Sequence, residues 1–208
     1  MPKVIFFTNL VSQISDAIIK PAPGAWDVQV HSMDVPPAEK AALASDADFF
    51  ILFPGRIDDE AIQAAKQLKL IQLVSAGYDA MNTDLCRELG IPISNNGGAN
   101  AIDVAEHTVS MILALFRRLR ELDPNVRNDL WSAIDTGLST YTLEGKTLGI
   151  IGFGKIGQRV ATLLGSWGAE LLYADAFPAN PEIEKALGVT RVERDELLRR
   201  SDVVTLHV

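Results

Sequence analysis

Residues 147–175 read TLGIIGFGKIGQRVATLLGSWGAELLYAD, and this stretch decides the fold. A short apolar run at 148–151 opens it and has the composition of a buried parallel strand. The turn at 152–157 follows at once and fits the pattern G-x-G-x-x-G, and apolar side chains at helical spacing come after it. A second strand pattern at 170–173 completes the order strand, turn, helix and strand, which is typical of a dinucleotide-binding βαβ unit.

Each glycine of the turn has a separate physical task. Gly152 permits the tight turn off the strand, and Gly154 has no Cβ, so a pyrophosphate can approach the backbone. Gly157 lets the helix pack close to the strand. The N-terminus of that helix offers N–H groups and the positive end of the helix dipole to phosphates. An incidental glycine turn in a doubly wound domain is the alternative, and the order of the flanking elements argues against it.

Asp175 stands about 20 residues after the glycines, where a dinucleotide-binding unit places its ribose-binding acid. Its carboxylate can accept hydrogen bonds from both ribose hydroxyls, and it would repel a 2′-phosphate. The next residues, 176–178, are Ala, Phe and Pro, so no Arg or Lys follows closely. The sequence therefore favours NAD over NADP as the cofactor.

Composition and charge exclude several classes of protein. A chain of 208 residues is long enough for one large domain or two small ones. Its net charge of −8 argues against a nucleic-acid partner. The single cysteine, Cys86, excludes an internal disulfide and favours a reducing compartment. The three histidines are scattered and show no spacing typical of a metal site.

The sequence also lacks the signs of a membrane or secreted protein. The apolar run near the N-terminus is too short for a signal peptide. Residues 101–122 come nearest to the roughly 20 apolar residues of a membrane span, but charged side chains interrupt them. We therefore expect a cytoplasmic protein with no membrane partner.

Strand and helix patterns alternate from residue 1 to about residue 100. The expected strands lie at 4–7, 28–30, 49–53, 71–74 and 91–94. The expected helices lie at 12–19, 37–44, 58–68 and 83–89. This alternation predicts a parallel sheet with helices on both faces. A polar, glycine-rich linker at 95–100 closes this first part, and Asn100 can cap the helix that follows.

The helix expected at 101–122 opens the second part of the chain. Between residues 104 and 116 it is apolar nearly all round, which is typical of a helix buried on every side. We expect it to cross between two domains or to lie in a subunit interface. After Asp175 the alternation resumes, with helices expected at 181–187 and 195–200 and strands at 189–192 and 203–208.

Four stretches are similar, in the same order, to a known family. They are LVSAGYD at 73–79, VAEHT at 104–108, LEGKTLGIIGFGKIG at 143–157 and SDVVTLHV at 201–208. On these motifs the chain resembles the N-terminal two-thirds of the D-isomer-specific 2-hydroxyacid dehydrogenases. The resemblance implies an α/β fold with a flavodoxin-like substrate domain at 1–100. It also implies a Rossmann NAD-binding domain at 101–208, with a doubly wound parallel sheet that is incomplete at its C-terminal end.

The resemblance also implies roles for individual residues. The turn of Ser75, Ala76 and Gly77 is similar to the loop whose backbone N–H groups hold the substrate carboxylate, and a glycine turn is chemically suited to that role. Thr108 corresponds to a residue of the nicotinamide pocket. The residues implied in NAD binding are Thr108, Gly152, Gly154, Lys155, Ile156, Gly157, Asp175, His207 and Val208.

For function, the resemblance implies an NAD-dependent oxidoreductase that reduces a small 2-keto acid to a D-2-hydroxy acid. The substrate would be of the glyoxylate, hydroxypyruvate or pyruvate class, and the protein would form a homodimer through the helix region 101–122. The sequence does not tell which 2-hydroxy acid is involved.

The family's catalytic Arg, Glu and His lie downstream of the segment that matches 203–208. We therefore expect no catalytic residue in this chain and interpret it as a truncated part of such an enzyme. The alternative hypothesis is a catalytically inactive NAD-binding module. Glu106 and His107 do not offer a substitute pair, because adjacent helical residues point about 100° apart. His207 is not assigned the role of the family's catalytic histidine, which comes much later.

Overall fold

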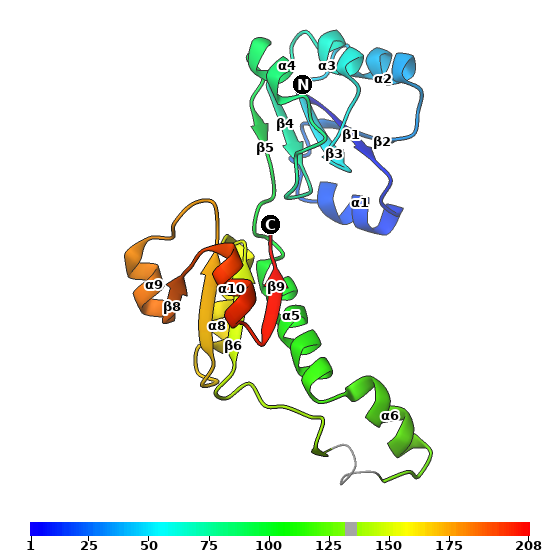
Figure 1. Ribbon diagram of the computed structural model, residues 1–208. Coiled ribbons are helices and arrows are strands. Elements are labelled where there is room, and N and C mark those ends of the chain that lie inside the picture. The colour runs from blue at the N-terminus through cyan, green and yellow to red at the C-terminus, as the bar shows by residue number, and fades with distance from the viewer. Residues whose placement is uncertain (132–136) are drawn as a thin grey trace. The chain divides into compact units, whose positions relative to one another are not determined.

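The computed structural model describes residues 1–131 and 137–208, and its strands form two separate parallel sheets (Figure 1). The chain divides accordingly into two units, Met1–Ala99 and Asn100–Val208. Each unit alternates strands and helices, as the sequence pattern predicts. No helix among the described residues is long and apolar enough to cross a membrane.

The sheet of the first unit has five strands in the order β2-β1-β3-β4-β5, and every neighbouring pair is parallel. The strands are β1 (Lys3–Thr8), β2 (Asp27–Ser32), β3 (Phe49–Phe53), β4 (Leu70–Leu73) and β5 (Ile93–Ser94). This order is that of flavodoxin-like folds. The predicted fold of the first unit is therefore confirmed.

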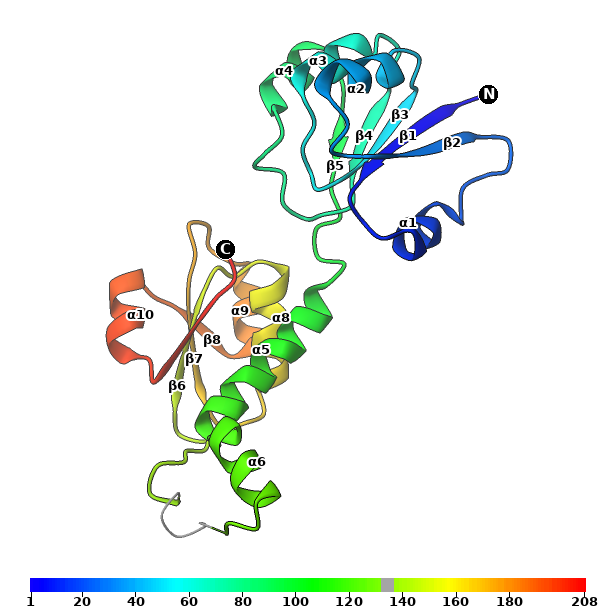
Figure 2. The same ribbon diagram turned by 90° about the vertical axis from the view of Figure 1, so that its right-hand side faces the viewer.

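Helices cover both faces of this sheet. Figure 2 shows α2 (Pro37–Ala44), α3 (Asp59–Ala64) and α4 (Thr83–Glu88) together on one side and α1 (Ser12–Ile19) on the other. The side chains packed between the sheet and α2, α3 and α4 include Ile5, Phe7, Phe50, Leu52, Ile71 and Leu73, which are fully buried. Each large apolar side chain buried in this way contributes about 1.5–3 kcal/mol to folding. Along β3 (Phe49–Phe53) one face is buried and the other is half-buried, which agrees with its continuous apolar run.

The sheet of the second unit has four parallel strands in the order β8-β7-β6-β9. They are β6 (Thr147–Ile151), β7 (Glu170–Ala174), β8 (Val189–Arg191) and β9 (Val203–Leu206). Counted within the unit, this is the order 3-2-1-4, which begins the Rossmann arrangement. The doubly wound parallel sheet predicted for this part of the chain is confirmed.

Among the described residues, three helices pack on one face of the second sheet and one packs on the other. The first group is α5 (Ala101–Phe116), α8 (Lys155–Leu164) and α9 (Pro181–Leu187), and α10 (Arg194–Arg200) lies opposite (Figure 2). Val160, Leu164 and Tyr173 are fully buried in the core beneath the first group. Leu172 and Leu197 form a smaller core beneath α10.

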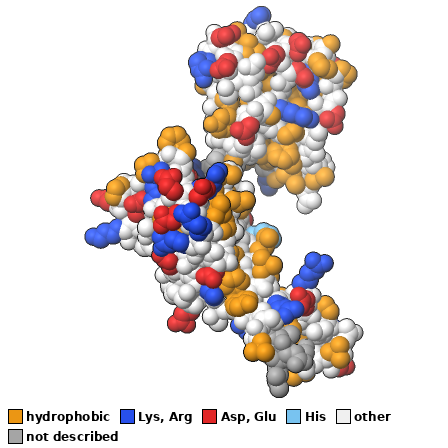
Figure 3. Space-filling model, viewed as in Figure 1, with side chains coloured by type: hydrophobic (Ala, Val, Ile, Leu, Met, Phe, Trp, Pro, Cys, Tyr) orange, Lys and Arg blue, Asp and Glu red, His pale blue; other side chains and the backbone are white. Residues whose placement is uncertain are grey.

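The prediction of one continuous helix at 101–122 is wrong. Helix α5 ends at Phe116, and Arg118 adopts a left-handed conformation with φ of 50° before α6 (Leu119–Arg127) begins. Side chains along α5 are also exposed: Met111 is 53% and Leu115 74% accessible. Figure 3 shows hydrophobic side chains gathered over this helix. An all-round apolar pattern does not distinguish a core helix from one with an uncovered apolar face.

A smaller expectation, about the start of α5, also fails. The side chain of Asn100 makes no capping hydrogen bond at the start of α5. Helix α8 ends at Leu164 with Gly165 as its C-cap, and Gly168 lies in the turn before β7 with φ of 71°. Gly168 therefore provides the left-handed turn into the strand, which also favours glycine.

Candidate functional site

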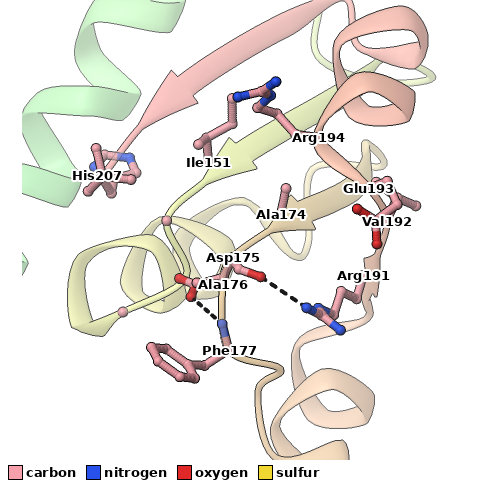
Figure 4. A pocket seen from close by; sticks show the side chains of 13 residues that line it. Ile151, Ala174, Asp175, Ala176, Phe177, Arg191, Val192, Glu193, Arg194 and His207 are labelled. Carbon is pink, nitrogen blue, oxygen red and sulfur yellow. Dashed lines mark hydrogen bonds between the residues drawn. The ribbon is translucent and has the colours of Figure 1, made fainter.

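The candidate site is a cavity of about 530 Å³ in the second unit, where β6, β7 and β9 end. Five residues expected to bind the cofactor line it: Gly152, Gly154, Asp175, His207 and Val208. Figure 4 shows these elements around the cavity. Strand β6 has β7 on one side and β9 on the other, so the chain reverses its direction of sheet growth here. Ligands of open α/β sheets bind at such a switch point, beyond the carboxyl ends of the strands.

The glycine turn is held by close backbone packing at two of its three glycines. Gly152 has φ of 87°, and a Cβ at this position would overlap the carbonyl oxygen of His207. A Cβ on Gly157 would overlap the carbonyl oxygen of Gly152. Gly154 differs, because a Cβ there would meet no atom within 4 Å and its φ is −75°. The protein itself therefore requires Gly152 and Gly157, whereas the absence of a side chain at Gly154 leaves space open to the cavity.

Helix α8 begins directly after Gly154, which is its N-cap. The first turn of the helix itself contains no acidic residue. The N–H of Gln158 forms the first helical hydrogen bond, to the carbonyl of Gly154 at 3.0 Å. The N–H groups of the preceding residues point out of the helix end, and such an end is suited to a phosphate group.

Asp175 follows β7 and joins two loops at the edge of the cavity. Its Oδ2 accepts a hydrogen bond from the backbone N–H of Phe153 at 2.6 Å, and its Oδ1 accepts one from Phe177 at 2.9 Å. The bond from Phe153, followed by that from Phe177, holds the pKa of Asp175 below 3.8. A carboxylate has about four acceptor positions, so two remain for a ligand.

Sequence reasoning missed an arginine that lies beside this acid. Nη2 of Arg191 donates a hydrogen bond to the backbone carbonyl of Asp175 at 3.0 Å (Figure 4). Arg191 and Arg194 both line the cavity. The residues directly after Asp175 are not basic, but the parallel strand β8 brings Arg191 opposite Tyr173. The sequence does predict a strand at 189–192. Pairing that strand with β7 would have predicted that Arg191 lies near Asp175.

His207 contributes to the site mainly through its backbone. Its N–H donates to the carbonyl of Ile151 at 2.7 Å, which extends the pairing of β6 with β9. Its ring Nε2 lies 3.0 Å from Oγ1 of Thr205, and burial lowers the pKa of the imidazole below 6.5. The carbonyl of His207 packs directly against Gly152.

The remaining expected cofactor residues do not line this cavity. Lys155, Ile156 and Gly157 form the first turn of α8, next to Gly154. Thr108 lies on α5, and its hydroxyl donates to the carbonyl of Val104 at 2.8 Å. Their roles stay predictions.

The residues expected to bind substrate belong to the first unit. They follow β4, and Ala76 and Gly77 are exposed. The hydroxyl of Ser75 donates to the carbonyl of Gly77 at 3.0 Å, and Nδ2 of Asn95 donates to the carbonyl of Ala76 at 2.6 Å. A Cβ on Gly55 would lie 2.7 Å from Oγ of Ser75, so the turn packs closely on a second loop.

Comparison with known proteins matches this architecture to one family. Residues 109–208 match the model of the D-isomer specific 2-hydroxyacid dehydrogenase NAD binding domain. The chain resembles the D-isomer-specific 2-hydroxyacid dehydrogenases. It is 34% identical to a glyoxylate reductase of Aeropyrum pernix over 88% of this chain and 57% of that protein. It is 32% identical to a glyoxylate reductase of Thermofilum pendens over 100% of this chain and 62% of that protein.

Solved structures extend the resemblance to three dimensions. A D-lactate dehydrogenase from Aquifex aeolicus, complexed with NAD and lactic acid, has a TM-score of 0.81 and 30% identity. It is matched by 98% of this chain, which covers 60% of that structure. The PH0520 protein from Pyrococcus horikoshii has a TM-score of 0.79 at 30% identity, over all of this chain and 62% of that one. The chain thus spans 57–62% of the length of these four relatives.

Replacing Gly154 should separate folding from binding. Because an added methyl group meets no protein atom, Gly154→Ala should change the free energy of unfolding by less than about 1 kcal/mol. The methyl group would occupy the approach to the turn, so the Kd for NADH should rise at least about tenfold. Urea unfolding and NADH fluorescence titration measure the two effects.

Gly152→Ala is the comparison, and it should lose stability. Unchanged NADH affinity in Gly154→Ala would contradict the placement of the pyrophosphate.

Replacing Asp175 should lower stability in a pH-dependent way. Asp175→Asn leaves one backbone N–H facing an NH2 group, which should cost about 1–3 kcal/mol near neutral pH. Because the folded pKa lies below 3.8, this stability is present above about pH 4 and is lost as the pH falls through the folded pKa. Urea unfolding at several pH values should show the unfolding free energies of the two proteins converging in acid.

Asp123→Asn, which removes an exposed ion pair with Arg127, is the control with little expected effect on the unfolding free energy. A difference that persists in acid would show that the charge of Asp175 is not the cause.

Proposed function

We propose that this chain supplies the NAD-binding domain and part of the substrate domain of an NAD-dependent oxidoreductase. The reaction is the reduction of a small 2-keto acid, of the glyoxylate, hydroxypyruvate or pyruvate class, to a D-2-hydroxy acid. The observation that carries the proposal is the cavity lined by the open Gly154 and by Asp175, inside the region that matches the NAD binding domain. The names glyoxylate reductase and D-lactate dehydrogenase among its relatives support the substrate class.

The residues at the turn suit a dinucleotide diphosphate. Gly154, Lys155 and Ile156 form the start of α8. Their backbone N–H groups and the cationic side chain of Lys155 would bind the diphosphate there. Gly152 and Gly157 keep the turn in place by packing against the backbone. The two unused acceptor positions of Asp175 suit the hydroxyls of the adenine ribose. NADH supplies the hydride when bound, and this chain's own part is to bind and orient it.

The flanking segments complete the proposed site. His207 and Val208 line the cavity on the β9 side. Thr108 on α5 is assigned to the nicotinamide end, and its bond to Val104 fixes the hydroxyl.

The first unit provides the substrate domain in this proposal, with domains at about 1–100 and 101–208. The exposed turn of Ser75, Ala76 and Gly77 would present backbone N–H groups to the carboxylate of the keto acid. Contacts from Ser75 to Gly77 and from Asn95 to Ala76 fix the carbonyls of the turn. A pre-formed turn of this kind binds an anion without paying for its own ordering at the moment of binding.

Binding and turnover should separate in this chain. NADH fluorescence titration should show saturable binding, because the elements that contact the dinucleotide are present. Absorbance assays with glyoxylate, hydroxypyruvate and pyruvate should show no turnover by the 208 residues, since we assign no catalytic acid or base among them. In a protein that extends past Val208, one of these acids should support NADH oxidation.

Each part of this assay can contradict the proposal separately. Absence of NADH binding would remove the cofactor assignment. Turnover by the 208 residues would overturn the assignment of no catalytic residue. An extended protein that binds NADH but oxidises it with none of the three acids would favour the inactive NAD-binding module.

We also propose that two copies of the protein pair through the region 101–122. Met111 and Leu115, about one turn apart on the same face of α5, are more than half exposed, and Leu119 on α6 is exposed as well. Exposed apolar side chains gathered in this way are typical of protein–protein interfaces (Figure 3).

Sedimentation velocity tests this pairing. The wild-type chain should sediment as a dimer, and Met111→Glu/Leu115→Glu should sediment as a monomer because charges in an apolar interface are costly. Leu198→Glu, at a half-exposed position on α10, is the control that should stay dimeric. A monomeric wild-type chain at micromolar concentration would contradict the interface.

A cytoplasmic location fits the same proposal. The only cysteine of the chain, Cys86, is a buried free thiol, and burial raises its pKa. A reducing compartment keeps such a thiol unmodified. Cell fractionation followed by immunodetection would test the location.

A further inference from the structure

Two arginines that the cofactor assignment does not use line the same cavity as Asp175. Arg191 is the last residue of β8, and Arg194 is the first residue of α10. Both are exposed and both line the cavity (Figure 4). Helix α9 separates both arginines from Asp175 along the chain, so the fold and not the local sequence brings them there.

The position of Arg191 is fixed by its strand. Parallel pairing sets Arg191 opposite Tyr173, two residues before Asp175. Its Nη2 donates to the backbone carbonyl of Asp175 at 3.0 Å. A guanidinium has five N–H donors, so this bond leaves most of them for a ligand. The cation is therefore held at the end of the cavity where the ribose acid lies.

The carboxylate of Asp175 repels a phosphate on the ligand less strongly than its position in the sequence indicates. Each of its carboxylate oxygens accepts a backbone N–H, from Phe153 and from Phe177. Two N–H dipoles thus face its negative charge, and Arg191 lies on the carbonyl side of the same residue. Repulsion between Asp175 and an incoming phosphate is reduced by both groups.

The charges of the lining balance. Among the described lining residues, Arg191 and Arg194 offset Asp175 and Glu193. Arg194 also lies 3.4 Å from Asp195, an exposed pair that contributes little and can open. Arginine presents a planar fork of donors that matches a phosphate group well.

We propose that Arg191 binds a phosphate on the 2′-oxygen of the adenine ribose, so that the cavity accepts NADPH as well as NADH. This inference rests on the proposed dinucleotide site and adds a specificity-determining residue to it. It also revises the expectation, drawn from the residues directly after Asp175, that NADP is disfavoured.

Titration of both reduced cofactors tests the inference. The wild-type chain should bind NADPH with a Kd within about tenfold of that for NADH. Arg191→Ala should raise the ratio of the two Kd values at least about tenfold, which corresponds to losing one charge-assisted hydrogen bond to phosphate. The Kd for NADH itself should change by less than about threefold, since NADH lacks the 2′-phosphate.

Matched variants distinguish this role from a loss of structure or of charge. Arg199→Ala removes a cation from the same helix as Arg194 but outside the lining, and it should leave the ratio unchanged. Arg191→Lys keeps the charge and should retain part of the NADPH affinity. If Arg191→Ala fails to fold, the same ratio in Arg191→Gln decides. Competition by adenosine 2′,5′-bisphosphate and by AMP in the wild-type chain provides a second measurement, in which the bisphosphate should compete at least as well.

Failure of the inference and failure of the cofactor site give different results. A wild-type chain that binds neither cofactor would remove the dinucleotide site itself. A chain that binds NADH but rejects NADPH by far more than tenfold would overturn the inference and leave the site intact. An unchanged Kd ratio in Arg191→Ala would overturn it equally.

Discussion

The second unit depends on one close backbone approach, between the end of β6 and the segment after β9. Gly152 packs so tightly against the carbonyl of His207 that no side chain fits between them. The carbonyl of Gly152 in turn packs against Gly157, which brings the start of α8 against strand β6. Asp175 fixes the turn from the third side through the N–H of Phe153. Three strand ends are thus joined at one point, and the cavity is the space that remains above them.

Because the turn is held from below, its open side is available for a ligand. Gly154 faces the cavity without a side chain, and the uncapped first turn of α8 follows it directly. The rigid arrangement places N–H donors before a ligand arrives, so little ordering is needed on binding. Asp175 serves two purposes in this arrangement, because its carboxylate both joins the loops and keeps acceptor positions toward the cavity.

Most of the fold could be predicted from periodicity, and the errors lie where periodicity carries no information. The alternation of apolar strands and helices gave both parallel sheets, because strands covered on two faces need continuous apolar runs. The length and burial of the helix at 101–122 could not be predicted in this way. Its end depends on the left-handed conformation of Arg118, and its exposed apolar face has the same composition as a buried one. Arg191 was missed because its neighbour Asp175 is 16 residues away in the chain.

The sequence by itself determined the spacing of the glycine turn and the position of the acid after the second strand. These features are local, since a turn off a strand and the helix that follows span consecutive residues. Only the tertiary structure decided which glycines the protein itself requires and which one is left open, because that depends on the His207 carbonyl more than fifty residues away. It also decided that two arginines share the cavity with Asp175, since parallel pairing of β7 and β8 joins segments that a helix separates. The charge seen by a ligand is therefore a property of the assembled sheet and not of the motif.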